Sequence, residues 1–237
     1  MSPQNSTPDA PDPRPALTLD DPRVLQILST EHWSLLSARS LAYNEAFTRG
    51  GMFLTFLSMS FVALALAAQA MSFDRQFLII AAIVLAFDVI IGLTTYGRIM
   101  GANSDDMRAV HGMSRIRHGY TQIAPIVEPY FTTGVHDDLP GVMITYGSPP
   151  STWAGGVLYG LTTSAGMIGL IVSLVSGVLA GVLALLFGAS GGLALGIGVV
   201  GAVAVFAVII GTTSGYITRV QASVPVLFPT PGEGEGE

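Results

Sequence analysis

The chain has 237 residues, of which 50% are hydrophobic and only 11% are charged, whereas soluble domains carry about 25% charged residues. It contains no cysteine, which excludes disulfides and thiolate chemistry. All 10 basic residues are arginines, which excludes a P-loop lysine and a Schiff-base lysine. The net charge of -6 argues against nucleic acid as a partner.

The N-terminal part is expected to consist of a disordered tail and a helix. Residues 1–21 contain five prolines and four aspartates and lack the apolar run of a secretory signal. Asp21-Pro22 is typical of a helix start, because aspartate caps a helix and proline suits its first position. We therefore expect a cytoplasmic amphipathic helix over residues 22–51, with Gly50-Gly51 as a hinge into the membrane.

The charged residues of this helix need partners. Arg39 lies beside the apolar stripe, where an unpaired charge is costly. Glu31 and Glu45 lie at the edge of the same face and are candidate partners within the helix. Arg49 follows Glu45 by one helical turn, which is a favourable pairing.

Four stretches are long and apolar enough to cross a bilayer, for which about 20 residues suffice. No charged residue occurs between Thr152 and Thr218, and Gly188–Gly192 divides this region. Too few polar residues remain to cover a soluble core of this size. The predicted fold class is all-α, an integral membrane four-helix protein of two hairpins with cytoplasmic amphipathic helices. The first hairpin is expected over 52–97 and the Gly-rich second over 153–218, with spans near 52–71, 77–97, 160–187 and 193–217.

Asp88 is the one acidic residue inside a predicted span. It lies about 16 Å along the helix from Phe77, near the middle of the bilayer. No arginine or histidine occurs in any span, so we expect this carboxyl to be protonated. An intramembrane carboxyl is a candidate proton or cation site. The favoured alternative is a structural hydrogen bond to one of the serines in the spans: Ser58, Ser60, Ser173 or Ser176.

A second amphipathic helix is predicted within the cytoplasmic loop 98–152, near residues 104–124. Asn103-Ser-Asp-Asp106 is expected to cap it, and Pro125 to end it. Its polar face could bind an anionic lipid, a nucleotide or an acidic partner, but we favour a solvated face on a helix that packs against residues 22–49. The residues of that face are Arg108, His111, Arg115, His118 and Gln122.

Motifs for chemistry are weak. His136-Asp137-Asp138 with Glu128 has the side chains of a divalent-metal site but no diagnostic spacing, so no metal and no cofactor is expected. Gly196-Ile-Gly198-Val-Val-Gly201 matches a dinucleotide fingerprint in letters only, because it lies inside a span. No catalytic residue is predicted.

Pairs of glycines four residues apart occur throughout the second hairpin. Such pairs let helix backbones approach closely in a membrane. They predict close packing of the third and fourth spans, with each other or across a homo-oligomer. The pairs are Gly156/Gly160, Gly177/Gly181, Gly188/Gly192, Gly192/Gly196 and Gly211/Gly215.

The distribution of arginines predicts the orientation. Only Arg75 lies in the two loops on the opposite side. Seven arginines lie near the span ends on the first side: Arg39 and Arg49 before the first span, Arg98, Arg108, Arg115 and Arg117 between the second and third, and Arg219 after the fourth. Cytoplasmic loops are enriched in basic residues. Both termini and the central loop are therefore expected in the cytoplasm, the C-terminal residues 219–237 as a disordered acidic tail.

Residues 30–140 resemble an uncharacterised family of bacterial multi-span inner-membrane proteins. The resemblance implies a location in the bacterial inner membrane but no activity, and the family usually has a more apolar residue where Asp88 stands. It rests on Glu31-His-Trp-Ser-Leu-Leu-Ser-Ala-Arg39, Asn44-Glu45, Arg49-Gly-Gly-Met52, Asn103-Ser-Asp-Asp106, Met113-Ser-Arg-Ile-Arg117, Tyr120, Ala124-Pro125, Tyr130-Phe131 and His136-Asp137-Asp138.

The polar residues of these motifs group in the predicted cytoplasmic parts. They lead to the hypothesis of one juxtamembrane polar network, made of Arg39, Glu45, Arg49, Arg115, Arg117, Asp137 and Asp138.

Three classes of function remain open from the sequence. The favoured one is a non-enzymatic membrane module that oligomerises through its Gly-rich helices and presents a cytoplasmic helical platform to a protein partner. The alternative is a subunit of a small oligomeric channel or transporter that uses Asp88. A membrane enzyme is the least favoured, because no nucleophile–base pair or metal constellation occurs.

Overall fold

The computed structural model describes residues 18–19, 21–147 and 152–231, and all regular secondary structure in this part of the chain is helical. The two longest helices are α1 (Pro22–Met71) and α2 (Arg75–Ile123). Asp21 caps α1 by accepting a hydrogen bond from the backbone N–H of Arg23, as expected, and Pro22 occupies the first turn. Asp74 caps α2 in the same manner through the N–H of Phe77.

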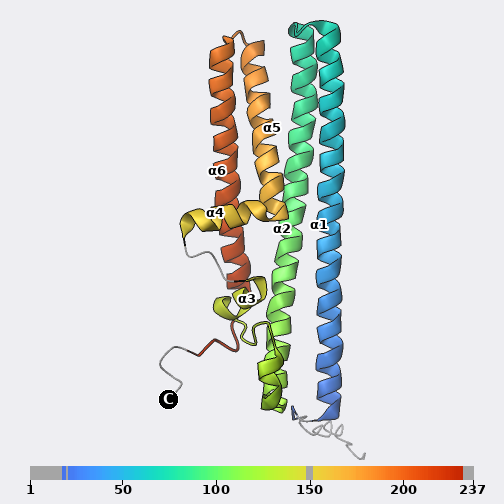
Figure 1. Ribbon diagram of the computed structural model, residues 1–237, viewed down its shortest axis with the longest axis vertical. Helices are drawn as coiled ribbons and strands as arrows, with labels where there is room; N and C mark the ends of the chain where they lie inside the picture. Colours follow the sequence, from blue (N-terminus) through green and yellow to red (C-terminus); the bar gives the residue numbers. More distant parts are fainter. Residues whose placement is uncertain (1–17, 20, 148–151, 232–237) are drawn as a thin grey trace, which may run out of the picture.

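The remaining elements are shorter and lie on one side of α2. Figure 1 shows α1, α2, α5 and α6 in a row, with α5 beside only one half of α2 and α6 continuing past the level of α4 towards α3. In the same view α4 lies across the long helices at the level where α5 begins, and α3 lies beside the other half of α2. These elements are η1 (Pro125–Tyr130), α3 (Leu139–Tyr146), α4 (Trp153–Thr162), α5 (Ser164–Leu186) and α6 (Gly191–Ser223).

The main core lies where α1, α2 and α5 meet. Phe53 of α1, Leu85 of α2 and Ile168 of α5 are each at most 2% exposed. Gly92 of α2 faces Val172 and Phe53, and an added Cβ would come within 2.5 Å of the Val172 side chain. The absence of a side chain at Gly92 thus allows α5 and α1 to approach α2 closely.

Glycines allow a second close approach, between α5 and α6. A Cβ at Gly177 would lie 2.5 Å from the Gly198 carbonyl oxygen and 2.7 Å from the Ala202 Cβ. A Cβ at Gly181 would lie 3.2 Å from the Ala194 carbonyl oxygen. The pair Gly177/Gly181 therefore packs the third predicted span against the fourth within one chain.

Gly215 does not pack against another described helix of the same chain. This contradicts the expectation that the glycine pairs pack the third and fourth spans against each other. Gly215 is exposed on α6, and a Cβ added there would meet no atom of the described chain within 4 Å. The reason is its position along α6. Ile209 already lies opposite Gly169, near the start of α5, so little of α5 remains beside Gly215.

The same correction applies to the other predicted packing glycines outside the Gly177/Gly181 pair. A Cβ added to any of them would meet no described atom within 4 Å. Those on α6 lie on its outer face, together with exposed valines such as Val200 and Val203. Packing of these glycines across a homo-oligomer stays a prediction. The corrected positions are Gly156 and Gly160 on α4 and Gly192, Gly196 and Gly211, together with Gly215, on α6.

Several predicted boundaries were wrong. α1 continues through Gly50-Gly51 without a hinge, since Ala46 and Phe53 on either side are buried. The predicted separate helix near 104–124 is the second half of α2. The sequence left open whether 160–187 is one tilted helix or a broken one, and the structure breaks it at Thr163, whose hydroxyl caps α5 by accepting from the N–H of Gly166.

The predicted C-terminal tail 219–237 also differs in part from the structure. Residues 219–223 belong to α6, and residues 224–231 fold back against α2. Most of the predicted N-terminal tail and residues 232–237 lie outside the described residues. Backbone hydrogen bonds to Asp137 and Asp138, which the sequence pattern did not indicate, hold the folded-back segment.

Candidate functional site

Three polar clusters occupy the half of the α1–α2 pair that extends beyond α5. We call this half, residues 22–49 of α1 and 98–123 of α2, the stalk. At about 1.5 Å per residue the 50 residues of α1 span about 75 Å, whereas the hydrocarbon core of a bilayer is about 30 Å thick. The stalk and its attached loops therefore contain most of the charged groups that could serve a function.

The first cluster surrounds Asp106 of α2, which is 6% exposed. The Arg39 Nε donates to its Oδ1 at 2.6 Å, and the Tyr146 hydroxyl donates to its Oδ2 at 2.5 Å. The Tyr43 hydroxyl lies 3.4 Å from the same Oδ2. Burial and the nearby carboxylate raise the pKa of Tyr146 well above its ordinary value, so this hydroxyl remains a donor.

The sequence placed Asp106 in a helix cap, and this was wrong. Asn103-Ser-Asp-Asp106 lies inside α2, and Asp106 points toward α1 and α3. Arg39 therefore finds its partner on the neighbouring helix and not at Glu31 or Glu45. A clue was available, because an arginine beside an apolar stripe requires a buried acid somewhere in the fold.

The second cluster is centred on Glu45 and is more exposed. Arg98 of α2 donates to Glu45 Oε1 at 2.7 Å and to Oε2 at 3.1 Å. Arg49 donates to Oε1 at 3.0 Å, one turn along α1. These contacts join α1 to α2 at the start of the predicted spans, but exposed ion pairs contribute little to stability.

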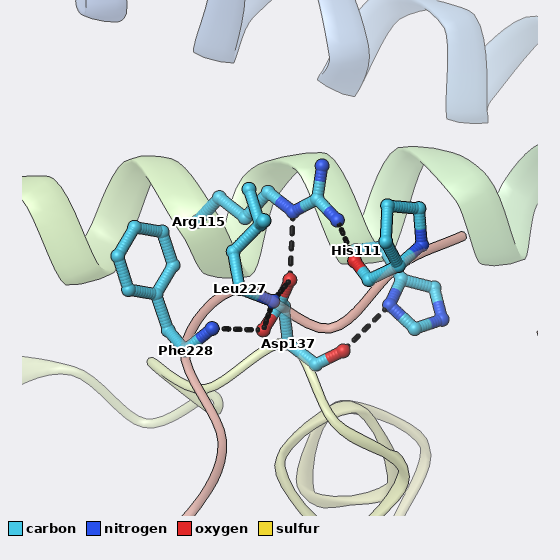
Figure 2. A network of polar contacts seen from close by, with 6 residues as sticks. His111, Arg115, Asp137, Leu227 and Phe228 are labelled. Carbon is cyan, nitrogen blue, oxygen red and sulfur yellow. Dashed lines mark hydrogen bonds and ion pairs between the residues drawn. The ribbon is translucent and has the colours of Figure 1, made fainter.

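The third cluster is centred on Asp137, which lies in the loop between η1 and α3. The Asp137 side chain is fully buried. Arg115 Nε donates to Asp137 Oδ2 at 2.7 Å, and Arg115 also donates to the Pro225 carbonyl. The backbone N–H of Phe228 donates to Oδ1 at 2.7 Å, and that of Leu227 lies 3.0 Å from Oδ2. Figure 2 shows these groups converging on one carboxylate between α2 and the C-terminal segment.

Neighbouring contacts extend this cluster. His111 Nδ1 donates to the Asp137 carbonyl at 2.9 Å. The ring of His118 stacks on that of Phe228, with centroids 4.2 Å apart. Asp138 caps α3 through the N–H of Gly141 and accepts from the N–H and hydroxyl of Thr230 at 2.8 Å each. Together these bonds fasten residues 225–230 to the stalk.

The charges of both aspartates are favoured by their surroundings. Burial opposes ionisation of Asp137, but the N–H groups of Phe228 and Leu227 and the Arg115 guanidinium outweigh it and hold the pKa of Asp137 below its ordinary value. Burial likewise opposes ionisation of Asp138, and hydrogen bonds from Thr230 and Gly141 lower the pKa of Asp138.

The structure therefore distributes the residues of the hypothesised polar network over separate clusters. Glu45 and Arg49 join Arg98, Arg39 joins Asp106, and Arg115 joins Asp137 with the C-terminal segment. Arg117 forms no ion pair with the described residues and lies 3.4 Å from the Gly134 carbonyl oxygen. Asp106, Tyr146, Arg98 and the C-terminal segment were missed by the sequence-based hypothesis.

Asp88 lies between helices inside the single chain and is fully buried. The Ser60 hydroxyl of α1 donates to Asp88 Oδ1 at 3.0 Å, one of the serine contacts expected from the sequence. The other oxygen, Oδ2, has no hydrogen-bond partner among the described residues. Within the described chain, no group of three or more histidines or acids is placed to hold a metal ion.

Comparisons with known proteins give no identity. No protein-family model matches the chain, no curated protein is significantly similar to it, and no solved structure is either. The resemblance to a bacterial inner-membrane family stays a prediction. Among the described residues, four helices (α1, α2, α5 and α6) are long and apolar enough to cross a membrane, which suggests a multi-pass membrane protein.

Proposed function

We propose that this chain is a non-enzymatic inner-membrane module of two transmembrane hairpins, which self-associates through α6 and presents its stalk in the cytoplasm to a protein partner. The observation that carries the platform is the uncovered side of the stalk. Among the described residues, only α2 lies beside the α1 half of the stalk in Figure 1, and these residues leave the opposite side of α1 open.

The open side of α1 has the composition of a contact surface. Trp33, Leu41 and Phe47 are 66%, 71% and 69% exposed. Only three charged residues occur between Val24 and Thr48, and two of them, Arg39 and Glu45, pair with α2. Large apolar side chains on a face with few charges favour burial against another protein when the face lies in water.

The outer face of α6 supports the self-association. Gly192/Gly196 and Gly211/Gly215 leave open space, and small residues on a lipid-facing helix favour helix–helix contact in a membrane. Leucine at Gly211 would fill the space in which a second helix would pack.

Site-directed photo-crosslinking in native membranes tests both parts. A photoreactive residue placed at position 33 and one placed at position 47 should capture the same distinct protein. One at Phe187, which is 90% exposed in the turn between α5 and α6, should not. Trp33→Glu should abolish the adduct formed from position 47. Gly211→Leu should reduce the homo-oligomer in the same membranes, whereas Gly97→Leu on α2, which also has open space, should not.

Two results would contradict the proposal. Adducts at positions 33 and 47 that contain only a second copy of the chain would make the stalk a self-association surface. An oligomer unaffected by Gly211→Leu would remove α6 as the contact.

The alternative function, a channel or transporter subunit that uses Asp88, has a direct test. Burial of Asp88 against Ser60 inside one chain supports a structural role over a pore-lining one. Asparagine keeps the acceptor for the Ser60 hydroxyl. We therefore expect Asp88→Asn to keep the oligomer and to shift the free energy of unfolding by at most about 1 kcal/mol. Proton or cation flux in liposomes that falls with this substitution would favour the channel.

A further inference from the structure

A cavity of about 720 Å³ lies between α2, α3, α4 and α6, which is within the range of small-molecule sites, roughly 300–1,000 Å³. The lining from α6 is mainly apolar and includes Phe206 and Ile209. The lining from α2 includes the polar residues Asn103, Ser104 and Asp106. Figure 1 places α4 across the long helices at the level where α5, a predicted span, begins. The cavity thus combines an apolar and a polar side at the predicted membrane boundary.

The charges and rings of the lining favour a positive ligand. Asp106 is the only charged side chain among the described residues of the lining, and no arginine or histidine belongs to it. Arg39, which pairs with Asp106, is not part of the lining, so the ion pair presents its carboxylate and not its guanidinium to the cavity. Five of the seven tyrosines of the chain contribute to the walls, and aromatic rings attract ammonium groups: Tyr43, Tyr96, Tyr146, Tyr159 and Tyr216.

An unpaired polar group gives a second, independent indication. Ser104 belongs to the lining and is 4% exposed, and its buried hydroxyl oxygen has no hydrogen-bond partner in the described chain. A buried hydroxyl without a partner costs free energy. A ligand with a polar head at this wall would supply that partner.

We propose that this cavity binds an amphipathic organic cation, with its ammonium head toward Asp106 and the tyrosines and its apolar tail along α6. The head group of an aminolipid and a free long-chain amine share this chemistry. Binding in this cavity requires neither the open side of α1 nor the outer face of α6. The site is therefore independent of the proposed platform.

Three eight-carbon probes with different heads test the selectivity. Octylammonium, octanol and octanoate are dialysed against the full chain in nanodiscs of phosphatidylglycerol, a lipid without an amine, and uptake by empty nanodiscs is subtracted. Octylammonium should bind saturably, with a Kd about tenfold or more below those of octanol and octanoate. No saturable binding, or equal binding of all three probes, would overturn the proposal.

Leucine substitutions that fill the cavity can be compared with a matched substitution outside it. Gly160 and Gly156 belong to its lining, and a Cβ at either position meets no atom within 4 Å. Gly160→Leu and Gly156→Leu should keep the wild-type melting temperature and each raise the octylammonium Kd about tenfold or more. Gly51→Leu, also in open space but outside the lining, should leave the Kd unchanged. Undiminished binding in both filled variants would place the probe elsewhere and overturn the proposal.

Mass spectrometry of the purified protein separates the two sources. After expression in a host membrane that contains aminolipid, aminolipid retained by the wild type and lost from Gly160→Leu supports the site with a lipid as its occupant. Retention of none, together with octylammonium binding, supports the site with a free amine. Equal retention of aminolipid by the wild type and both filled variants would contradict a lipid-binding cavity.

Discussion

Replacing Asp137 with alanine is expected to lower the free energy of unfolding by about 3–5 kcal/mol, because removal of one partner of a buried ion pair leaves the other charge uncompensated. Arg115 would lose its carboxylate, and the N–H groups of Leu227 and Phe228 would lose their acceptor. The C-terminal segment would then separate from α2. Denaturant titration in detergent measures the stability, and hydrogen exchange at residues 225–231 measures the release.

A matched control distinguishes this effect from general loss of charge. Asp105 forms an exposed pair with Arg108, with 66% of its side chain accessible. Asp105→Ala should change stability by less than about 1 kcal/mol and should leave exchange at residues 225–231 unchanged. If Asp137→Ala behaves like Asp105→Ala, the carboxylate does not hold the segment.

The wild type should show a related dependence on pH. The pKa of Asp137 is lowered in the folded chain, so its contribution to stability is complete above the unfolded pKa of about 3.9 and is lost as the pH falls through the folded value. The C-terminal segment should therefore stay protected at neutral pH and lose its protection in strong acid, when exchange is compared with the intrinsic rate of an unstructured amide at the same pH.

Replacing Asp106 with alanine is expected to cost a similar amount, about 3–5 kcal/mol. The Arg39 side chain is 17% exposed and would lose its partner, and the Tyr43 and Tyr146 hydroxyls would lose their acceptor. The double substitution Arg39→Met with Asp106→Leu removes both charges at once. It should be more stable than Asp106→Ala, since apolar replacement of a whole buried pair is often tolerated. Unfolding titrations of the wild type, Asp106→Ala and the double variant test this coupling between Arg39 and Asp106.

Glu45 supplies the control for the Asp106 substitution. Its contacts with Arg49 and Arg98 also join α1 to α2, but the Glu45 side chain is 31% exposed. Glu45→Ala should cost less than about 1 kcal/mol. A loss for Asp106→Ala no larger than that for Glu45→Ala would show that the Asp106 cluster does not hold the stalk together.

Local signals predicted the helix starts and the apolar helices. The cap at Asp21 depends on two adjacent residues, and the four apolar helices depend on runs of about 20 residues, so both can be read without knowledge of the fold. Gly50-Gly51 misled because glycine only lowers helix propensity, by about 1 kcal/mol each. Burial of Ala46 and Phe53 against neighbouring helices outweighs that preference.

Glycine spacing alone could not separate the packing pairs from the others. Gly177/Gly181 and Gly211/Gly215 have the same spacing, yet only the first pair faces another helix of the chain. Which face of a helix meets a neighbour depends on where that neighbour begins and ends, and this information is absent from a four-residue pattern.

The sequence could predict that certain charged side chains need a partner, but not which residue that partner is. The position of Arg39 implied a partner, but its partner Asp106 is 67 residues away in the sequence and resembled a cap residue in a plausible capping motif. Asp137 and Leu227 are 90 residues apart, and backbone N–H groups that donate to a carboxylate leave no residue pattern. Such long-range contacts arise from the packing of whole helices, so they appear only in the structure.

The most direct test of the proposed arrangement is the sidedness of the stalk. The chain contains no cysteine, so single substitutions Ser37→Cys in the stalk and Gln76→Cys at the start of α2 can be labelled with a membrane-impermeant maleimide. In intact bacterial cells that express the protein, position 76 should react and position 37 should react only after permeabilisation. Labelling of position 37 in intact cells would contradict a cytoplasmic platform.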